Sequence, residues 1–259
     1  MNKTIYLLRH AKSSWKDADN INDYDRPLSS KGIQMAHFVG ETLHNMMATK
    51  KQQQKQEEGK VVVDLPDVIL SSSSVRTKDT LNIVLEEWML GGDSSSSGHR
   101  CSSQSYRRGK FSKVRKRISQ SKGEEEDDHE ILCCWCKILY SKSWYDLSNV
   151  GYLNHLVNML SSDDDEQDNI FSNANTIMIV GHNPSMEKLL NDLTFSSSPL
   201  RNNNENAEQQ QQQQQQQWQH YSPGHFYVVR FPPTLENWSD LGCYIERGGR
   251  GIIDMHLPE

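Results

Sequence analysis

Short runs of apolar residues that end abruptly in polar ones constrain the fold of this chain more than any other feature. Ile5 to Leu8 form such a run near the N-terminus, and Arg9 and His10 follow it at once. Residues 176–180 form another, and His182 stands two positions beyond it. Runs of this length are typical of buried strands in a parallel sheet. Because ligands of open α/β sheets bind outside the carboxyl ends of such strands, these polar residues are candidates for a functional site.

The rest of the chain alternates between strand-like runs and segments with apolar residues at helical spacing. Ser29 or Ser30 fits the N-cap of the first helix, and Asn183 fits that of the last, with Pro184 at its first position. We therefore predict an α/β fold, a single three-layer domain with a mostly parallel central sheet flanked by helices. Helices are predicted over 30–46, 75–90, 143–160 and 184–193, and strands over 5–8, 67–70, 131–140, 176–180, 225–231 and 243–246.

Four cationic or titratable residues follow three of these predicted strands. Arg76 lies in the first turn of the helix after strand 67–70, where a helix N-terminus and a guanidinium can both face an anion. A histidine can act as a nucleophile, and a guanidinium can bind a phosphoryl group through two hydrogen bonds. Any one of these residues alone could be an ordinary surface or structural side chain. Together, Arg9, His10, Arg76 and His182 indicate a common pocket.

Several stretches of biased composition lie outside this pattern. Only 35% of the residues are hydrophobic and the mean hydropathy is −0.77, so part of the chain must lie outside the core. Low-complexity insertions are predicted at about 49–60, 91–130, 161–169 and 196–220. The remainder suits one domain, so 1–259 is predicted to be a single interrupted domain. A basic docking patch for RNA or acidic partners between residues 100 and 122 is the alternative reading of the second insertion.

Charge and cysteine content narrow the class of protein further. The net charge of −6 gives no reason to expect nucleic-acid binding by the chain as a whole. Five unevenly spaced cysteines without a signal peptide are expected to be reduced, so we predict a cytoplasmic protein. No apolar run approaches the ~18 residues that span a bilayer. Cys133 and Cys136 have zinc-like spacing, but no second pair accompanies them, and buried thiols are favoured over a metal site.

With these residues placed, the chain resembles the histidine phosphatase superfamily, also called phosphoglycerate mutase-like, and within it the SixA-type phosphohistidine phosphatases. Five matching pieces run in the family's order and span nearly the whole chain outside the insertions. The Arg-His piece alone is weak evidence for the family, whereas the five pieces in the family's order are specific to it. The pieces are Leu8-Arg9-His10-Ala11-Lys12-Ser13-Ser14-Trp15, Asp25-Arg26-Pro27-Leu28-Ser29-Ser30-Lys31-Gly32, Ser74-Val75-Arg76-Thr77, Leu139-Tyr140 and Val180-Gly181-His182-Asn183-Pro184.

This resemblance implies that His10 takes up the phosphoryl group while Arg9, Arg76 and His182 surround it. Water would then hydrolyse the phosphohistidine intermediate, with no metal and no cofactor. The task of the surrounding residues would be mostly electrostatic. His10 must attack as a neutral imidazole, so its other nitrogen is expected to bond to a backbone carbonyl. The partner would be a phosphorylated protein or a small phosphorylated substrate.

Two departures from the family pattern bear on the substrate. Lys16 stands where mutase-type relatives have an asparagine that contacts phosphate, so it is a candidate for substrate binding, although it could equally point to solvent. No carboxylate can be assigned as the general acid that protonates a poor leaving group. Asp17 and Asp25 are the nearest candidates, and Asp25 could instead hold its loop through Arg26.

The sequence thus predicts a metal-independent phosphatase that uses a phosphohistidine intermediate, with protein phosphohistidine as the expected substrate. A phosphatase of small phosphoesters is one alternative. A non-catalytic phospho-binding or scaffold protein is another, although the intact set of four residues disfavours it. A phosphomutase would need an acid and loop residues that the sequence does not display. The sequence indicates no particular oligomeric state.

Overall fold

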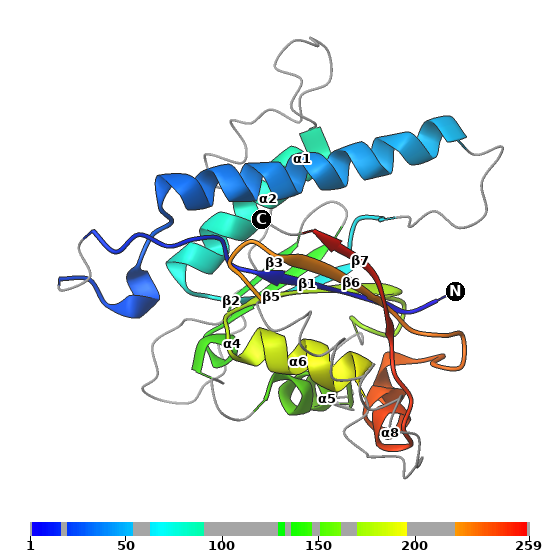
Figure 1. Cartoon of the computed structure of the whole chain (residues 1–259). Helices are drawn as coiled ribbons and strands as arrows, with labels where there is room; N and C mark the ends of the chain where they lie inside the picture. Colours follow the sequence, from blue (N-terminus) through cyan, green and yellow to red (C-terminus); the bar gives the residue numbers. More distant parts are fainter. Residues whose placement is uncertain are drawn as a thin grey trace, which may run out of the picture.

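A central sheet with helices on both faces forms the body of the protein (Figure 1). The computed structural model describes residues 2–16, 20–53, 63–90, 129–132, 136–146, 151–161, 170–195 and 221–257. Within these ranges seven strands form one sheet in the order β3-β4-β2-β5-β1-β6-β7. The strands are β1 (Thr4–Arg9), β2 (Val68–Ser72), β3 (His129–Leu132), β4 (Lys137–Ser141), β5 (Thr176–Gly181), β6 (Phe226–Arg230) and β7 (Ile252–Leu257).

The four central strands β4, β2, β5 and β1 are parallel to one another. Antiparallel strands extend the sheet on both sides, with β3 beside β4 and with β6 and β7 beyond β1. The predicted α/β class with a mostly parallel central sheet is therefore confirmed. Because β2, β5 and β1 are consecutive in the sheet and parallel, the residues that follow these three strands emerge at one edge.

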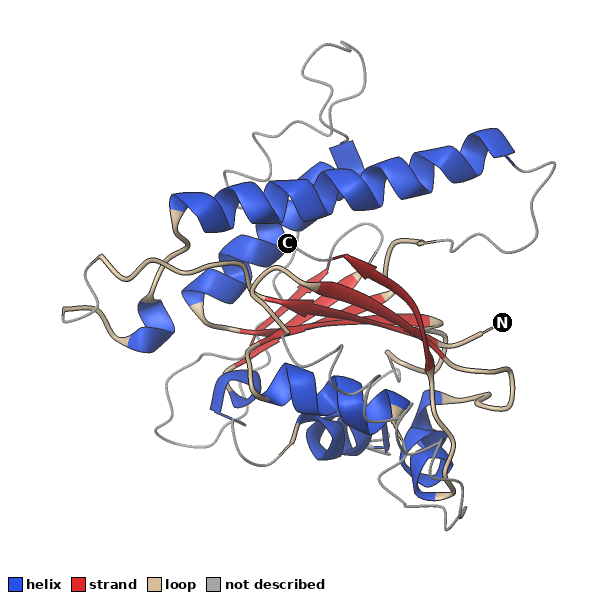
Figure 2. Cartoon of the chain, in the orientation of Figure 1, coloured by secondary structure: helices blue, strands red, loops and turns tan. Residues whose placement is uncertain are grey.

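Helices cover the sheet in two layers, which Figure 2 shows above and below the strands. The long helix α1 (Ser30–Gln53) and helix α2 (Val75–Leu90) pack on one face. Helices α5 (Tyr152–Ser161), α6 (Ser185–Thr194) and α8 (Leu241–Glu246) lie on the other face, with the short α4 (Ser143–Asp146). The 3-10 turns are η1 (Asp23–Asp25) and η2 (Trp238–Asp240). The Ser29 hydroxyl accepts the Gly32 N–H at 3.0 Å, which confirms a serine cap for α1.

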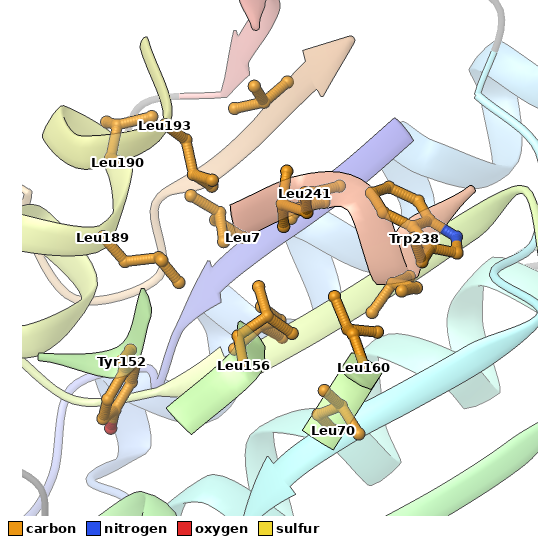
Figure 3. Close-up of a cluster of buried hydrophobic side chains, with 14 of the residues drawn as sticks. Leu7, Leu70, Tyr152, Leu156, Leu160, Leu189, Leu190, Leu193, Trp238 and Leu241 are labelled. Atoms are coloured by element: carbon orange, nitrogen blue, oxygen red, sulfur yellow. The ribbon is translucent and has the colours of Figure 1, made fainter. Parts of the chain in front are cut away.

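Side chains of the central strands alternate between two apolar clusters, one on each face. In β1, Ile5 and Leu7 belong to the cluster under α5 and α6, whereas Tyr6 and Leu8 belong to the cluster under α1 and α2. Figure 3 shows the first cluster, where leucines of α5 and α6 meet Leu7. Since both faces are covered, the central strands read as continuous apolar runs rather than as alternating ones.

Four local predictions are wrong. Within the strand predicted over 131–140, residues 131–132 lie in β3 and residues 137–140 lie in the antiparallel β4, and the range 143–160, expected as one helix, holds the separate helices α4 and α5. Residues 243–246 lie in α8, while the edge strand is β7. Helix α6 begins at Ser185 with Pro184 at its N-cap, and no side chain caps it. Asn183 donates through Nδ2 to the Tyr221 carbonyl at 3.0 Å, and its Oδ1, the atom that would cap a helix, accepts no hydrogen bond from the described residues.

Most of the predicted insertions lie outside the described residues. Of these segments the structure describes α1 as far as Gln53, the first residues of β3 from His129, and Ser161 at the end of α5. None of the helices in the described ranges combines the length and the apolar composition that crossing a bilayer requires.

Candidate active site

The carboxyl ends of β1, β5 and β2 bring the predicted site residues together. Arg9, the last residue of β1, pairs in register with Gly181, the last residue of β5. The next backbone N–H, that of His10, donates to the Gly181 carbonyl at 3.1 Å. β2 lies on the other side of β5 and ends at Ser72, just before the helix that carries Arg76. The loops after these three strands therefore converge, as the sequence pattern predicts.

His10 is held with one ring nitrogen fixed and the other left available. Its Nδ1 lies 2.8 Å from the Ala11 carbonyl oxygen. Because a carbonyl only accepts, Nδ1 must carry the proton, and Nε2 keeps a free lone pair. The side chain is buried, with 7% of its surface exposed. Burial, and then the positive charges of Arg76 and Arg9, lower the pKa of His10 to about 3, although the bond to Ala11 opposes this shift. His10 is therefore a neutral imidazole at physiological pH.

His182 faces His10, with 4.9 Å between the ring centroids. Three hydroxyl groups surround its Nε2, those of Ser72 at 2.8 Å, Thr77 at 3.2 Å and Ser74 at 3.3 Å. Its Nδ1 is buried and has no hydrogen-bond partner among the described residues. Burial, followed by the proximity of His10 and of the arginines, holds the pKa of His182 well below its ordinary value.

Arg9 and Arg76 each keep one buried donor that is not used within the described residues. Arg9 donates through Nη1 to the Tyr221 carbonyl, and Arg76 donates through Nη1 to the Asp23 carbonyl. The Nε–H groups of both arginines are buried without a partner in the part of the chain that the structure describes. Buried donors of this kind are rare in folded proteins, and they carry a free-energy cost that a bound acceptor would relieve. Two guanidiniums and a buried imidazole nitrogen therefore form a site suited to an anion.

Asp23 completes the site, and the sequence analysis did not find it. Its Oδ2 accepts from Arg76 Nη2 at 2.8 Å and from the Tyr145 hydroxyl at 2.8 Å, and its Oδ1 lies 3.0 Å from Arg26 Nη2. The suggestion that Asp25 holds the loop through Arg26 is wrong, because Asp23 makes that contact and Asp25 is exposed. The one sequence signal for Asp23 was its i, i+3 spacing from Arg26. The loop carries four aspartates, and the sequence does not distinguish among them.

Backbone contacts close the loop that carries Asp23. Ser13 and Leu28 form an isolated antiparallel bridge. The Ser14 N–H donates to the Pro27 carbonyl at 2.8 Å, and the Ser29 N–H donates to the Lys12 carbonyl at 2.9 Å. The two arms of the loop are thus fixed to each other, and the turn η1 projects to Arg76. Lys16 is exposed on this loop, and Asp17 lies outside the described residues.

Tyr152 holds the backbone of His182 through a hydrogen bond. Its hydroxyl donates to the Trp144 carbonyl and accepts the His182 backbone N–H at 3.3 Å. Figure 3 shows Tyr152 at the margin of the apolar cluster, in the first turn of α5. A Cβ atom at position 181 would lie 2.7 Å from the Tyr152 ring, so only glycine fits between β5 and this ring. Gly181 therefore allows the close approach that places His182.

Within the described ranges, no group of three or more His, Cys, Asp or Glu side chains is arranged to hold a metal ion. Cys136 is buried, as the sequence analysis favoured, and Cys133 lies outside the described residues. The described side chains place a neutral imidazole, that of His10, beside two buried guanidiniums that could bind an anion.

Comparisons with known proteins concern the fold of the chain. No protein-family model matches the chain. Over 81 residues it is 36% identical to an uncharacterised chloroplastic protein of Arabidopsis thaliana, a stretch that covers 31% of this chain and 29% of that protein. The chain thus matches less than a third of the length of this curated relative.

Two solved structures extend the comparison to the whole chain. A candidate phosphohistidine phosphatase SixA from Nakamurella multipartitia has a TM-score of 0.51 at 15% identity, covering 100% of this chain and 96% of that one. Another from Agrobacterium tumefaciens has a TM-score of 0.48 at 16% identity, covering 100% and 99%. The first likeness shows the fold. This chain therefore has the fold of the SixA-type histidine phosphatases, and the resemblance found in the sequence is confirmed at that level.

Proposed function

We propose that the protein is a phosphatase that passes a phosphoryl group through His10, with phosphohistidine in proteins as its substrate. The observation that carries this proposal is the 2.8 Å contact between His10 Nδ1 and the Ala11 carbonyl. That contact directs the proton to Nδ1 and leaves Nε2 as a nucleophile, and the lowered pKa keeps the ring neutral.

The reaction has two displacements at phosphorus. In the first, the Nε2 lone pair forms an N–P bond while the bond from phosphorus to the leaving atom breaks, and the leaving group departs with that electron pair. In the second, a water oxygen attacks phosphorus and loses its proton to solvent. The N–P electron pair then returns to Nε2, which releases inorganic phosphate and restores neutral His10.

The neighbouring groups would stabilise the transferred phosphoryl group. Arg9 and Arg76 each offer a buried, unused Nε–H, and His182 offers its buried Nδ1. Hydroxyl donors at His182 Nε2 would favour the tautomer that carries the proton on Nδ1. Preorganised donors of this kind account for much of the rate enhancement in phosphoryl transfer, because the reaction needs positioning and charge stabilisation above all.

The leaving group is the reason to favour phosphohistidine. Asp23 is a carboxylate bonded to Arg76 at the site, and its pKa is lowered: burial would raise it, but the hydrogen bonds from Arg76 and Tyr145 and the charges of Arg76 and Arg26 outweigh burial. An ionised carboxylate cannot donate a proton to an alkoxide. A phosphohistidine ring that is protonated on its other nitrogen leaves as neutral imidazole, whose conjugate acid has a pKa near 6.5, so an N-phosphorylated histidine fits this site best. Small phosphoesters with good leaving groups are the alternative substrates.

A trapping experiment tests the mechanism. Brief incubation with labelled substrate should leave acid-labile, base-stable phosphate on wild-type protein and none on His10→Asn. His37→Asn is the matched control, because His37 lies exposed on α1 and pairs with Glu87, away from the site. Undiminished turnover by His10→Asn would rule out His10 as the nucleophile. The same assays with and without a chelator test the metal-independent reaction that we propose.

A phosphate-release panel tests the substrate class. Phosphohistidine peptide, an aryl phosphate and a sugar phosphate should be hydrolysed in that order of efficiency. Equal efficiency on the sugar phosphate would assign the protein to the phosphoester class and would require a proton donor. Asp17→Asn and Asp25→Asn would then be the first variants to compare for a selective loss on alkyl substrates.

A further inference from the structure

The part of the site that reaches solvent, here called the mouth, includes Asp23, Tyr24 and Tyr145. Asp23 has 48% of its side-chain surface exposed, whereas the side chain of Arg76, to which it is bonded, has 6% exposed. His10 and His182 are buried as well. The carboxylate thus lies on the solvent side of Arg76.

Aromatic rings flank this carboxylate. The Tyr145 ring lies edge-on to the His182 ring, with 5.2 Å between centroids, and its hydroxyl donates to Asp23. Tyr24, which follows Asp23 in η1, packs against Tyr145 at 5.0 Å in a T-shaped arrangement. The mouth therefore combines two aromatic rings with one half-exposed negative charge.

The cations around Asp23 determine how that charge acts. Arg76 and Arg26 both contact it, and Lys142 lies farther out, with its Nζ 5.8 Å from the centroid of the Tyr24 ring. A dianionic phosphoryl group would accept hydrogen bonds from the buried Nε–H groups of Arg9 and Arg76. In an in-line displacement the leaving group departs on the side of phosphorus opposite His10, and one that leaves past Arg76 lies beside the exposed carboxylate of Asp23. A negative charge on the leaving group would meet Asp23, whereas a neutral or cationic ring would lie against the carboxylate and the tyrosines.

We propose that Asp23 is a specificity-determining residue that excludes substrates with an anionic leaving group and favours those with a neutral or cationic aromatic one, such as imidazole. This inference rests on the proposed phosphatase function. The proposed function distinguishes substrates by the pKa of the leaving group, and this inference adds the charge of the leaving group. Leaving groups of similar reactivity are therefore distinguished when their charges differ. In this role Asp23 transfers no proton.

Matched aryl phosphates isolate the effect of charge. The substrates are 4-carboxyphenyl, 4-carbamoylphenyl and 4-(aminomethyl)phenyl phosphate, whose rings carry an anion, a neutral amide and a cation. The measured quantity is the ratio of kcat/KM for the carbamoyl substrate to that for the carboxy substrate. Intrinsic reactivity cancels when this ratio is compared between wild type and Asp23→Asn. Asp146→Asn is the control, because Asp146 is an exposed carboxylate next to Tyr145 and its loss changes the net charge equally.

In Asp23→Asn we expect this ratio to fall about three- to tenfold, the size expected for one charge several ångströms away near a protein surface. Asp146→Asn should keep the wild-type ratio. The wild-type ratio should itself decline as ionic strength rises from about 0.05 to 0.5 M, because exposed charges are screened. That measurement needs no variant, and Asp23→Ser provides a second substitution should Asp23→Asn not fold.

Three outcomes would overturn the inference. An equal loss of kcat/KM for all three substrates in Asp23→Asn would mean that Asp23 only positions Arg76. An unchanged ratio in an active variant that still forms the His10 phosphoenzyme would refute the inference and leave the proposed function intact. Absence of both turnover and phosphoenzyme in wild-type protein would refute the proposed function, and this inference with it.

Discussion

Mild acid should destabilise this protein through its two buried histidines. The pKa of His10 is lowered from 6.5 to about 3 in the folded state, chiefly by burial, and that of His182 is lowered as well. In the unfolded chain both rings bind a proton near pH 6.5. Below that pH the unfolded state therefore holds more protons than the folded state, so the free energy of unfolding decreases as pH falls.

The size of the effect for His10 follows from the difference between its pKa in the unfolded chain, near 6.5, and its pKa of about 3 in the folded state. For His10, every pH unit between about 6.5 and 3 costs about 1.4 kcal/mol of stability. From pH 7 to pH 5 His10 alone should cost about 2 kcal/mol, and His182 adds a loss of the same sign. This range lies above the ordinary titration of carboxylates, so the histidines dominate the difference between wild type and histidine variants.

The assay is urea unfolding at pH 7, 6 and 5 for wild type, His10→Asn, His182→Asn and the double variant. Each single variant should lose less stability between pH 7 and pH 5 than wild type, by about 2 kcal/mol for His10→Asn. The double variant should have the flattest profile of the four. If His10→Asn loses as much stability as wild type over this range, then His10 is not a neutral, buried imidazole and the proposed nucleophile lacks its basis. The comparison concerns the slope, so any cost of the substitution at pH 7 cancels.

Three further predictions follow from the site and the fold. Arg9→Lys and Arg76→Lys should each lower kcat/KM about 30- to 1,000-fold, since a lysine cannot reproduce the planar donor fork; near-wild-type kinetics for both would contradict the anion site. Across a series of aryl phosphates, log(kcat/KM) should fall steeply with rising leaving-group pKa, and a flat plot would reveal a proton donor. Gly181→Ala should lower the free energy of unfolding by about 1–3 kcal/mol through contact with the Tyr152 ring, as denaturant titration can measure; an unchanged stability would show that the ring moves aside freely.

The parallel core was predictable because burial leaves a strong local signature. Strands covered on both faces are apolar along their buried length, as residues 5–8 of β1 and 177–180 of β5 are, and helices such as α2 repeat apolar residues at their own period. The edges of the sheet carry no such constraint. Residues 243–246 were predicted as a strand but form part of α8, and β7 escaped prediction because its residues are only partly buried. Tertiary packing decides such segments.

The sequence by itself determined which chemical groups reach the site. An arginine at the end of β1, a histidine directly after it and a histidine directly after β5 emerge at the same edge of a parallel sheet, and they meet because β1 and β5 are neighbours. The family resemblance implies roles for the same residues, and the likeness to a solved structure shows the expected fold.

Only the tertiary structure determined the pKa values and the hydrogen-bond partners of these groups. Burial lowers the pKa of His10, and the loop closed between Ser13 and Leu28 brings Asp23 rather than Asp25 to Arg76. The hydroxyls of Ser72 and Thr77 at His182 Nε2 were likewise absent from the sequence argument. Hydrogen bonds and desolvation depend on ångström-scale distances between residues far apart in the chain, and no local pattern encodes those distances. The kinds of residue at a strand end can therefore be read from sequence, whereas their protonation and pairing depend on the packing around them.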